Sequence, residues 1–153
     1  MVRALEVFFL TGRPLTAHFA DTVSPLPGVE VVALGVQLPA DMIAVRVARR
    51  VDQQFEQGVI EEVRGLLESG VPRGARPFGG LVYRQILEYL DGVHDEAATR
   101  ALIVQENRRY ARRQLIWFRK EPNLMWFDGP GESEPTVAAV HRMLDERLKE
   151  IPH

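Results

Sequence analysis

The stretch Val31-Val32-Ala33-Leu34-Gly35-Val36 decides the fold class of this 153-residue chain. It is a continuous apolar run rich in β-branched residues, with Gly28 before it and Pro39 after it. Strands covered on both faces, as in a parallel sheet, have this continuous pattern, whereas strands with one solvated face alternate. The run therefore predicts a buried strand of an α/β fold.

Outward from this strand, the sequence predicts a chain that is mostly helical. Residues 2–10 are apolar nearly all round, which is typical of a helix buried on every side, and Gly12 and Pro14 end it. A short apolar run at 124–127 predicts a second strand. The other expected helices cover 15–20, 41–57, 59–69, 81–90, 95–120 and 135–149, separated by a Pro-rich connector at 24–28, a Gly- and Pro-rich loop at 71–80 and a linker at 129–135.

Two strands are too few for a sheet that is covered on both faces. The first helix is also too apolar to begin a chain in solvent. We therefore expect this chain to be the later part of a larger α/β protein, whose other half would supply the missing strands. The alternative is a partner chain that supplies them.

The segment from Arg108 to Lys120 carries six cations and no acid, although the whole chain has a formal charge of −2, so the remaining residues sum to −8. A helix advances ~100° per residue, which places these cations within an arc of roughly 140°. Tyr110, Trp117 and Phe118 fall on the other side, so we expect one cationic and one packed face. Because like charges repel, the stripe indicates an anionic partner such as a phosphate backbone. The alternative is a solvated helix face without a partner.

Composition excludes several classes of protein. The chain has no cysteine, which excludes disulfides and thiolate metal sites, and no apolar run long enough to cross a membrane. It has no P-loop motif to cradle a nucleotide phosphate, and its four histidines are scattered without metal-ligand spacing. With no signal peptide apparent, we expect a cytoplasmic protein.

Two smaller basic clusters remain. Arg46 and Arg50 share a helix face with i,i+4 spacing, and from the residues alone the favoured interpretation is a solvated face that pairs with Asp52 and Glu56. The segment Gly79-Gly80-Leu81-Val82-Tyr83-Arg84 opens a helix, where glycines and free amides would let a polyanion approach, unless it is a plain loop-to-helix junction.

In these segments the sequence resembles the tRNA dimethylallyltransferase family, also called tRNA isopentenyltransferase. The resemblance covers residues 1 to about 128, and the motifs follow the family's order. They are Arg3-Ala4-Leu5-Glu6-Val7 with Thr11-Gly12-Arg13-Pro14-Leu15; Leu34-Gly35 before Leu38-Pro39; Arg49-Arg50-Val51-Asp52-Gln53; Tyr83-Arg84 before Tyr89-Leu90-Asp91-Gly92; and Arg108-Arg109-Tyr110-Ala111-Arg112-Arg113-Gln114 with Trp117-Phe118-Arg119.

The resemblance implies the C-terminal half of such an enzyme. The fold expected is α/β and mostly helical: the C-terminal part of a P-loop-kinase-like parallel-sheet domain, plus the end of an inserted helical domain that grips the anticodon stem-loop of tRNA. Residues 1–28 would end the inserted domain, residues 29–128 would belong to the catalytic core, and residues 129–153 would form a linker and C-terminal helix.

The family moves a dimethylallyl group from dimethylallyl pyrophosphate to the exocyclic amine of the adenosine next to the anticodon, after the base leaves its stack. Its P-loop and catalytic aspartate are absent from this sequence, so the resemblance implies a chain that is inactive alone and holds no catalytic residue. Magnesium is implied for the family, without a ligand in this chain. The full-length enzyme is expected to be a monomer that binds no membrane.

Residue by residue, the resemblance implies that Arg50 helps to hold the leaving pyrophosphate, where a cation stabilises developing charge, and this reverses the solvated-face interpretation. Two departures weaken the expected RNA contacts: Val82 stands where the family usually has glycine, and Ile116 where it usually has threonine. The residues implied to contact tRNA are Arg3, Gly79, Gly80, Leu81, Val82, Tyr83, Arg84, Arg112, Arg113, Gln114, Leu115, Ile116, Trp117, Phe118 and Arg119.

Two other functions remain open from the sequence. One is a stand-alone RNA-binding module without catalysis. The other is a helical protein-interaction domain whose basic helix binds an acidic protein.

Overall fold

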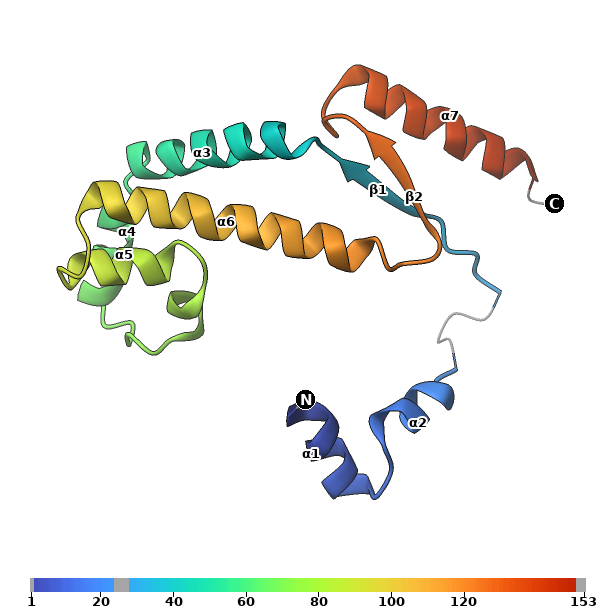
Figure 1. Cartoon of the computed structure of the whole chain (residues 1–153), viewed down its shortest axis with the longest axis horizontal. Coiled ribbons are helices and arrows are strands. Elements are labelled where there is room, and N and C mark those ends of the chain that lie inside the picture. The colour runs from blue at the N-terminus through green and yellow to red at the C-terminus, as the bar shows by residue number, and fades with distance from the viewer. Residues whose placement is uncertain (1, 24–27, 151–153) are drawn as a thin grey trace. The chain divides into compact units, whose positions relative to one another are not determined.

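Figure 1 shows the computed structural model of the chain, which describes residues 2–23 and 28–150. The chain divides into two compact units, Met1–Val32 and Ala33–His153. Apart from Gly28, the connector predicted at 24–28 lies outside the described residues.

The first unit holds two short helices, α1 (Val2–Thr11) and α2 (Leu15–Ala20), which confirms both predicted helices. Gly12 ends α1 with a φ of 69°, a conformation that glycine adopts without steric cost. The prediction that α1 is buried on every side is wrong, because Phe9 and Leu10 are 80% and 85% exposed. Two helices of this length offer too little surface to cover an all-apolar rod.

Four helices build the core of the second unit: α3 (Ala40–Glu56), α4 (Val59–Glu68), α5 (Tyr83–Leu90) and α6 (Glu96–Phe118). Each of them was predicted to within a few residues. Apolar side chains from these helices and from the loop between α4 and α5 meet in one cluster. Its buried members are Val51, Val59, Val63, Phe78, Val82, Ile86 and Ile103.

Helix α6 begins at a regular N-cap and is fastened to α3. The Asp95 carboxylate accepts a 2.7 Å hydrogen bond from the Ala98 backbone N–H, which confirms the predicted cap. One turn further, the Arg100 guanidinium lies 3.9 Å from the centre of the Phe55 ring and 3.4 Å from a carboxylate oxygen of Asp52. This contact between α3 and α6 fixes the helix that carries the basic segment.

The two predicted strands pair in parallel as β1 (Ala33–Gln37) and β2 (Leu124–Asp128). Gly35 lies opposite Trp126, and a Cβ added at Gly35 would come within 2.8 Å of the indole ring. Among the described residues β1 pairs only with β2, and helix α7 (Glu134–Glu150) packs on β2 (Figure 1). The residues of β1 are half-buried or exposed, which agrees with the expectation that the cover of both its faces comes from outside this chain. Strand β1 therefore has more apolar surface than the described residues bury.

The loop before α5 departs from the prediction. It contains a 3₁₀ turn, η1 (Arg76–Gly79), and α5 begins at Tyr83 rather than Leu81. The cause is Val82, whose φ of 77° is incompatible with a right-handed helix. Its N–H is bonded to the Gln85 side-chain oxygen at 2.8 Å, and this buried contact holds the turn.

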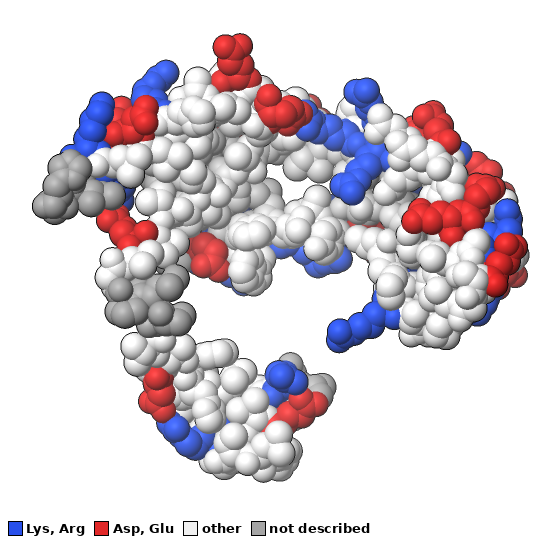
Figure 2. Space-filling model, turned by 180° about the vertical axis from the view of Figure 1, so that it is seen from behind, with Lys and Arg blue, Asp and Glu red and all other residues white. Residues whose placement is uncertain are grey.

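Charged side chains of the two signs are unevenly spread over the second unit. Figure 2 shows acidic side chains gathered over the end formed by α4 and α5, with cations interspersed among them. Apart from Arg100, which is paired with Asp52 and Glu96, the cations of α6 begin further along that helix, at Arg108. The basic segment therefore starts beyond the acidic end.

Candidate functional site

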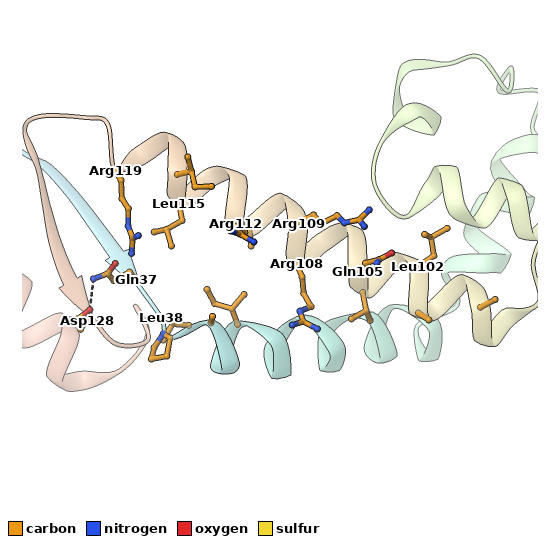
Figure 3. Close-up of a pocket in the computed structure, with 18 of the residues that line it drawn as sticks. Gln37, Leu38, Leu102, Gln105, Arg108, Arg109, Arg112, Leu115, Arg119 and Asp128 are labelled. Carbon is orange, nitrogen blue, oxygen red and sulfur yellow. Dashed lines mark hydrogen bonds between the residues drawn. The ribbon is translucent and has the colours of Figure 1, made fainter.

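A groove of about 1660 Å³ follows one side of α6 and reaches the sheet. Gln37 and Asp128, the last residues of β1 and β2, line it where the Gln37 side-chain N–H donates to the Asp128 carboxylate at 2.8 Å (Figure 3). Leu38, which follows β1, lines the same end. The carboxyl ends of parallel strands are where α/β proteins place their ligands.

Three arginines of α6 and Arg119, which directly follows it, line the groove, and three of these four lack an ion-pair partner among the residues that the structure describes. Arg109 is paired with Glu106 at 2.8 Å, whereas Arg108, Arg112 and Arg119 are exposed and make no ion pair within the described ranges. Figure 3 shows Arg108 extending from α6 toward α3. Cations left without acids on a groove wall can receive an anionic ligand.

A second hollow, of about 700 Å³, lies between α3, α4, the start of α5 and α6. Arg50 lines it from α3, Glu62 from α4 and Tyr83 from α5. Its wall also carries four amide side chains, those of Gln54, Gln57, Asn107 and Gln114. The hollow therefore combines one cation, one carboxylate and several groups that both donate and accept hydrogen bonds.

Tyr83 and Glu62 form the shortest polar contact in this hollow. The Tyr83 hydroxyl donates to a Glu62 carboxylate oxygen at 2.6 Å. This hydrogen bond, together with partial burial and the negative charge of Glu62, raises the pKa of Tyr83 above its ordinary value. The tyrosine hydroxyl thus keeps its proton and directs it at Glu62.

The residues that the resemblance implies for ligand binding fall into two main groups. The hollow gathers five of them from three segments: Arg50, Leu81, Val82, Tyr83 and Gln114. The groove gathers Arg112, Leu115, Ile116 and Arg119. Ala111, between these groups on α6, lines both cavities.

The other implied residues lie outside both cavities. Arg3 is on α1, 88% exposed at its side chain and 3.7 Å from Glu6. Gly79, Gly80 and Arg84 are exposed around the start of α5. Arg113, Trp117 and Phe118 lie on other faces of α6.

The expectation of a packed aromatic face on α6 is wrong. Tyr110 and Trp117 are 45% and 59% exposed, and the Trp117 and Phe118 rings contact each other edge to face with centroids 5.0 Å apart. The Arg113 guanidinium lies 5.8 Å from the centre of the Tyr110 ring. Helix periodicity separates these rings from most of the cations, but it does not tell whether anything covers them.

The predicted pairing of Arg46 and Arg50 with Asp52 and Glu56 is wrong, although both arginines lie on an exposed face as expected. Arg46 pairs with Glu132 of the loop before α7, and the Arg46 guanidinium holds the pKa of that carboxyl below its usual value. Asp52 is paired with Arg100 instead. Arg50 has no ion-pair partner in the described part of the chain, so its charge remains available in the hollow.

Sequence reasoning missed several residues of these cavities. Gln37 and Asp128 end the two strands, and the rule that ligands meet the carboxyl ends of parallel strands was a signal that could have identified them. Glu62 and Asn107 had no such signal, because only the packing of α4 and α6 around Tyr83 brings them to the hollow.

Within residues 2–23 and 28–150, no three histidine, aspartate or glutamate side chains gather where they could hold a metal ion. In the same ranges, no helix is both long and apolar enough to cross a membrane.

Comparison with known proteins gives consistent matches. A model of the family described as IPP transferase matches residues 1–121. The tRNA dimethylallyltransferase of Geobacter metallireducens is 39% identical over 145 residues, covering 92% of this chain and 45% of that protein. The enzyme of the same name from Saccharopolyspora erythraea is 40% identical over 146 residues, covering 95% of this chain and 46% of that protein.

Solved structures agree. The crystal structure of the tRNA isopentenylpyrophosphate transferase of Bacillus halodurans matches with a TM-score of 0.74 and 31% identity, over 97% of this chain and 45% of that one. A second, from Staphylococcus epidermidis, matches with a TM-score of 0.70 at 21% identity, which shows the fold alone. This chain spans about half the length of the relatives it matches.

Proposed function

This chain belongs to the IPP transferase family, and from that membership we propose that it acts in the transfer of a dimethylallyl group from dimethylallyl pyrophosphate to tRNA. The acceptor proposed is the exocyclic amine of the adenosine next to the anticodon. In this proposal the described residues bind RNA and the pyrophosphate. The bond-making groups lie in the part of the family's length that this chain does not span. The setting proposed is the cytoplasm, where the enzyme would meet tRNA.

The observation that carries the proposal is the groove beside α6. Arg108, Arg112 and Arg119 present three positive charges along one wall, and the described residues offer them no acid in compensation. Phosphate groups of a nucleic acid are spaced to meet such a row, and the release of their counterions drives binding. Exposed Trp117 and Phe118 near the end of the same helix add ring surfaces on which unpaired bases stack.

The hollow supports a role for Arg50 in pyrophosphate binding. Its guanidinium is free of acids in the described residues and shares the hollow with Tyr83 and Gln114, which we propose as RNA contacts. A cation at the leaving group stabilises the charge that develops as the prenyl group departs. In this proposal the pyrophosphate would lie beside the RNA contacts, because Arg50 lines the same hollow as Tyr83 and Gln114.

The proposal is tested with a double charge reversal on the groove. A fluorescent anticodon stem-loop is titrated with the wild-type chain and with Arg108→Glu/Arg112→Glu, at several salt concentrations. We expect the wild type to bind with an affinity that falls steeply with salt. In the variant, the slope of log affinity against log salt should lose about one unit for each phosphate contact removed.

The matched control is Arg64→Glu/Arg142→Glu, which changes the net charge equally on exposed positions of α4 and α7 outside both cavities. It should bind almost as the wild type does. Equal loss of affinity in the two double variants would mean that net charge, and not the groove, determines binding. That result would remove the RNA-binding role of α6 from the proposal.

A further inference from the structure

The hollow beside Tyr83 has an unusual distribution of hydrogen-bond acceptors. Among the described residues that line it, Glu62 is the only carboxylate and Arg50 the only cation. Glu62 makes no ion pair with any residue that the structure describes; its one polar side-chain contact there is the Tyr83 hydroxyl. A carboxylate without an ion-pair partner repels phosphate. On a wall that is proposed to contact RNA, such a carboxylate is therefore suited to bind a hydrogen-bond donor of the RNA instead.

The hydrogen bond from Tyr83 to Glu62 determines what that partner is. A phenol has one proton, and here the proton points at Glu62 over 2.6 Å. The raised pKa of Tyr83 keeps that proton in place. The remaining lone pairs of the hydroxyl and the carboxylate are therefore acceptors only, and they lie side by side. Two adjacent acceptors match a primary amino group, which has two N–H donors.

The acceptor pair is held in position before any ligand arrives. Val82, directly before Tyr83, is buried, and its N–H is bonded to the Gln85 side chain at 2.8 Å. The Tyr83 ring lies against the Phe78 ring, with centroids 6.1 Å apart. Because the Tyr83 ring and the backbone before it are both held in place, little conformational entropy is lost when the hydroxyl accepts a hydrogen bond from a ligand.

The rest of the hollow fits a flat, polar, unpaired base. Tyr110 lines it from α6 and offers a ring on which a base can stack. The amides of Asn107 and Gln114 donate and accept on the same wall, as hydrogen bonding along a base edge requires. The amino group of such a base is the exocyclic amine of adenine, cytosine or guanine; uracil has none.

We propose that Glu62 and Tyr83 form an acceptor pair that selects an unpaired base with an exocyclic amine and rejects uracil. This inference rests on the proposed RNA-binding function and adds to it the group that is recognised and the two residues that recognise it. Glu62 acts here as a specificity residue in its own right, and Tyr83 presents the second acceptor.

The experiment compares two pairs of hairpins. In the first the bases differ by the amine alone, and in the second a carbonyl oxygen and an N3–H replace the amine and the free ring nitrogen. RNA hairpins share one stem and carry, at one loop position, adenosine or purine riboside, and cytidine or uridine; purine riboside is adenosine without its amine. We expect the full chain to prefer the amine-bearing loop of each pair by about tenfold, which is the worth of a hydrogen bond to a charged group. Glu62→Ala and Tyr83→Phe should each reduce that preference to about twofold or less.

Glu61→Ala is the matched control, because Glu61 neighbours Glu62 on α4, is exposed, pairs with Arg64 at 3.6 Å and does not line the hollow. It should keep the full preference. Tyr83→Phe retains the ring and its packing, so a lost preference in that variant reports on the hydroxyl and not on folding.

Two results overturn the inference while leaving the RNA-binding proposal intact: a wild type that binds all hairpins equally with a steep salt dependence, or a preference that survives both substitutions. A wild type that binds no hairpin contradicts both proposals.

Discussion

Val82 has a φ of 77° and a ψ of −63°, a γ-turn conformation that β-branched side chains rarely adopt. It is the only non-glycine residue with positive φ in the described chain. The family that the sequence resembles usually has glycine here, and the structure gives a physical reason: the turn before α5 has a positive φ, which glycine adopts without strain. Valine accepts the strain, and its buried side chain contributes to the core instead.

At position 82, glycine and alanine variants should therefore rank in stability in the opposite order to that expected within a helix. Val82→Gly and Val82→Ala both lose apolar burial, but only glycine relieves the backbone strain. We expect the glycine variant to be more stable than the alanine variant. Its free energy of unfolding, measured by urea denaturation, should be larger by about 1 kcal/mol. At buried Val63, inside α4, the same pair should show the opposite order by about 1 kcal/mol, because alanine is the better helix former. An alanine variant at least as stable as the glycine variant at position 82 would contradict the strained turn.

At the scale of elements, most helices and both strands follow from the sequence because their signals are local. Asp95 caps α6 through its own side chain, and Gly12 ends α1 through its own φ. The start of α5 was misplaced because valine carries no signal for a left-handed turn. The exposed face of α6 was misjudged for another reason: periodicity gives the direction of Tyr110 and Trp117 but not whether another element covers them.

The contact between β1 and β2 gives a second prediction. A methyl group at Gly35 would overlap the Trp126 ring, so Gly35→Ala should lower the free energy of unfolding by about 1–3 kcal/mol and change the tryptophan fluorescence. The matched control is Gly65→Ala in α4, where an added Cβ meets nothing within 4 Å. That variant should gain about 1 kcal/mol from helix propensity. If both alanine variants were stabilised, the close contact between the strands would be wrong.

At the scale of the whole molecule, the buried apolar core residues that the structure describes all belong to the second unit. Removal of residues 1–32 should therefore change the free energy of unfolding of the second unit by less than about 0.5 kcal/mol, measured by urea denaturation followed through the fluorescence of the tryptophans. A loss of several kcal/mol would show that residues 1–32 contribute to that core. The exposed Phe9 and Leu10 predict the companion result that this truncation lowers the binding of a hydrophobic dye.

The candidate site could be predicted only in part, and the reason lies in how it is assembled. The basic segment and Arg50 were visible because charge and spacing are properties of single segments. That Arg50, Tyr83 and Gln114 share one hollow depends on the packing of three helices, which no segment encodes alone. The roles assigned to these residues remain predictions that the hairpin titrations test.

The groove and the hollow lie on different sides of helix α6, and Ala111 lines both of them. A ligand that shifted α6 within one cavity would change the shape of the other, and thermodynamic reciprocity would then make the coupling between the two ligands mutual.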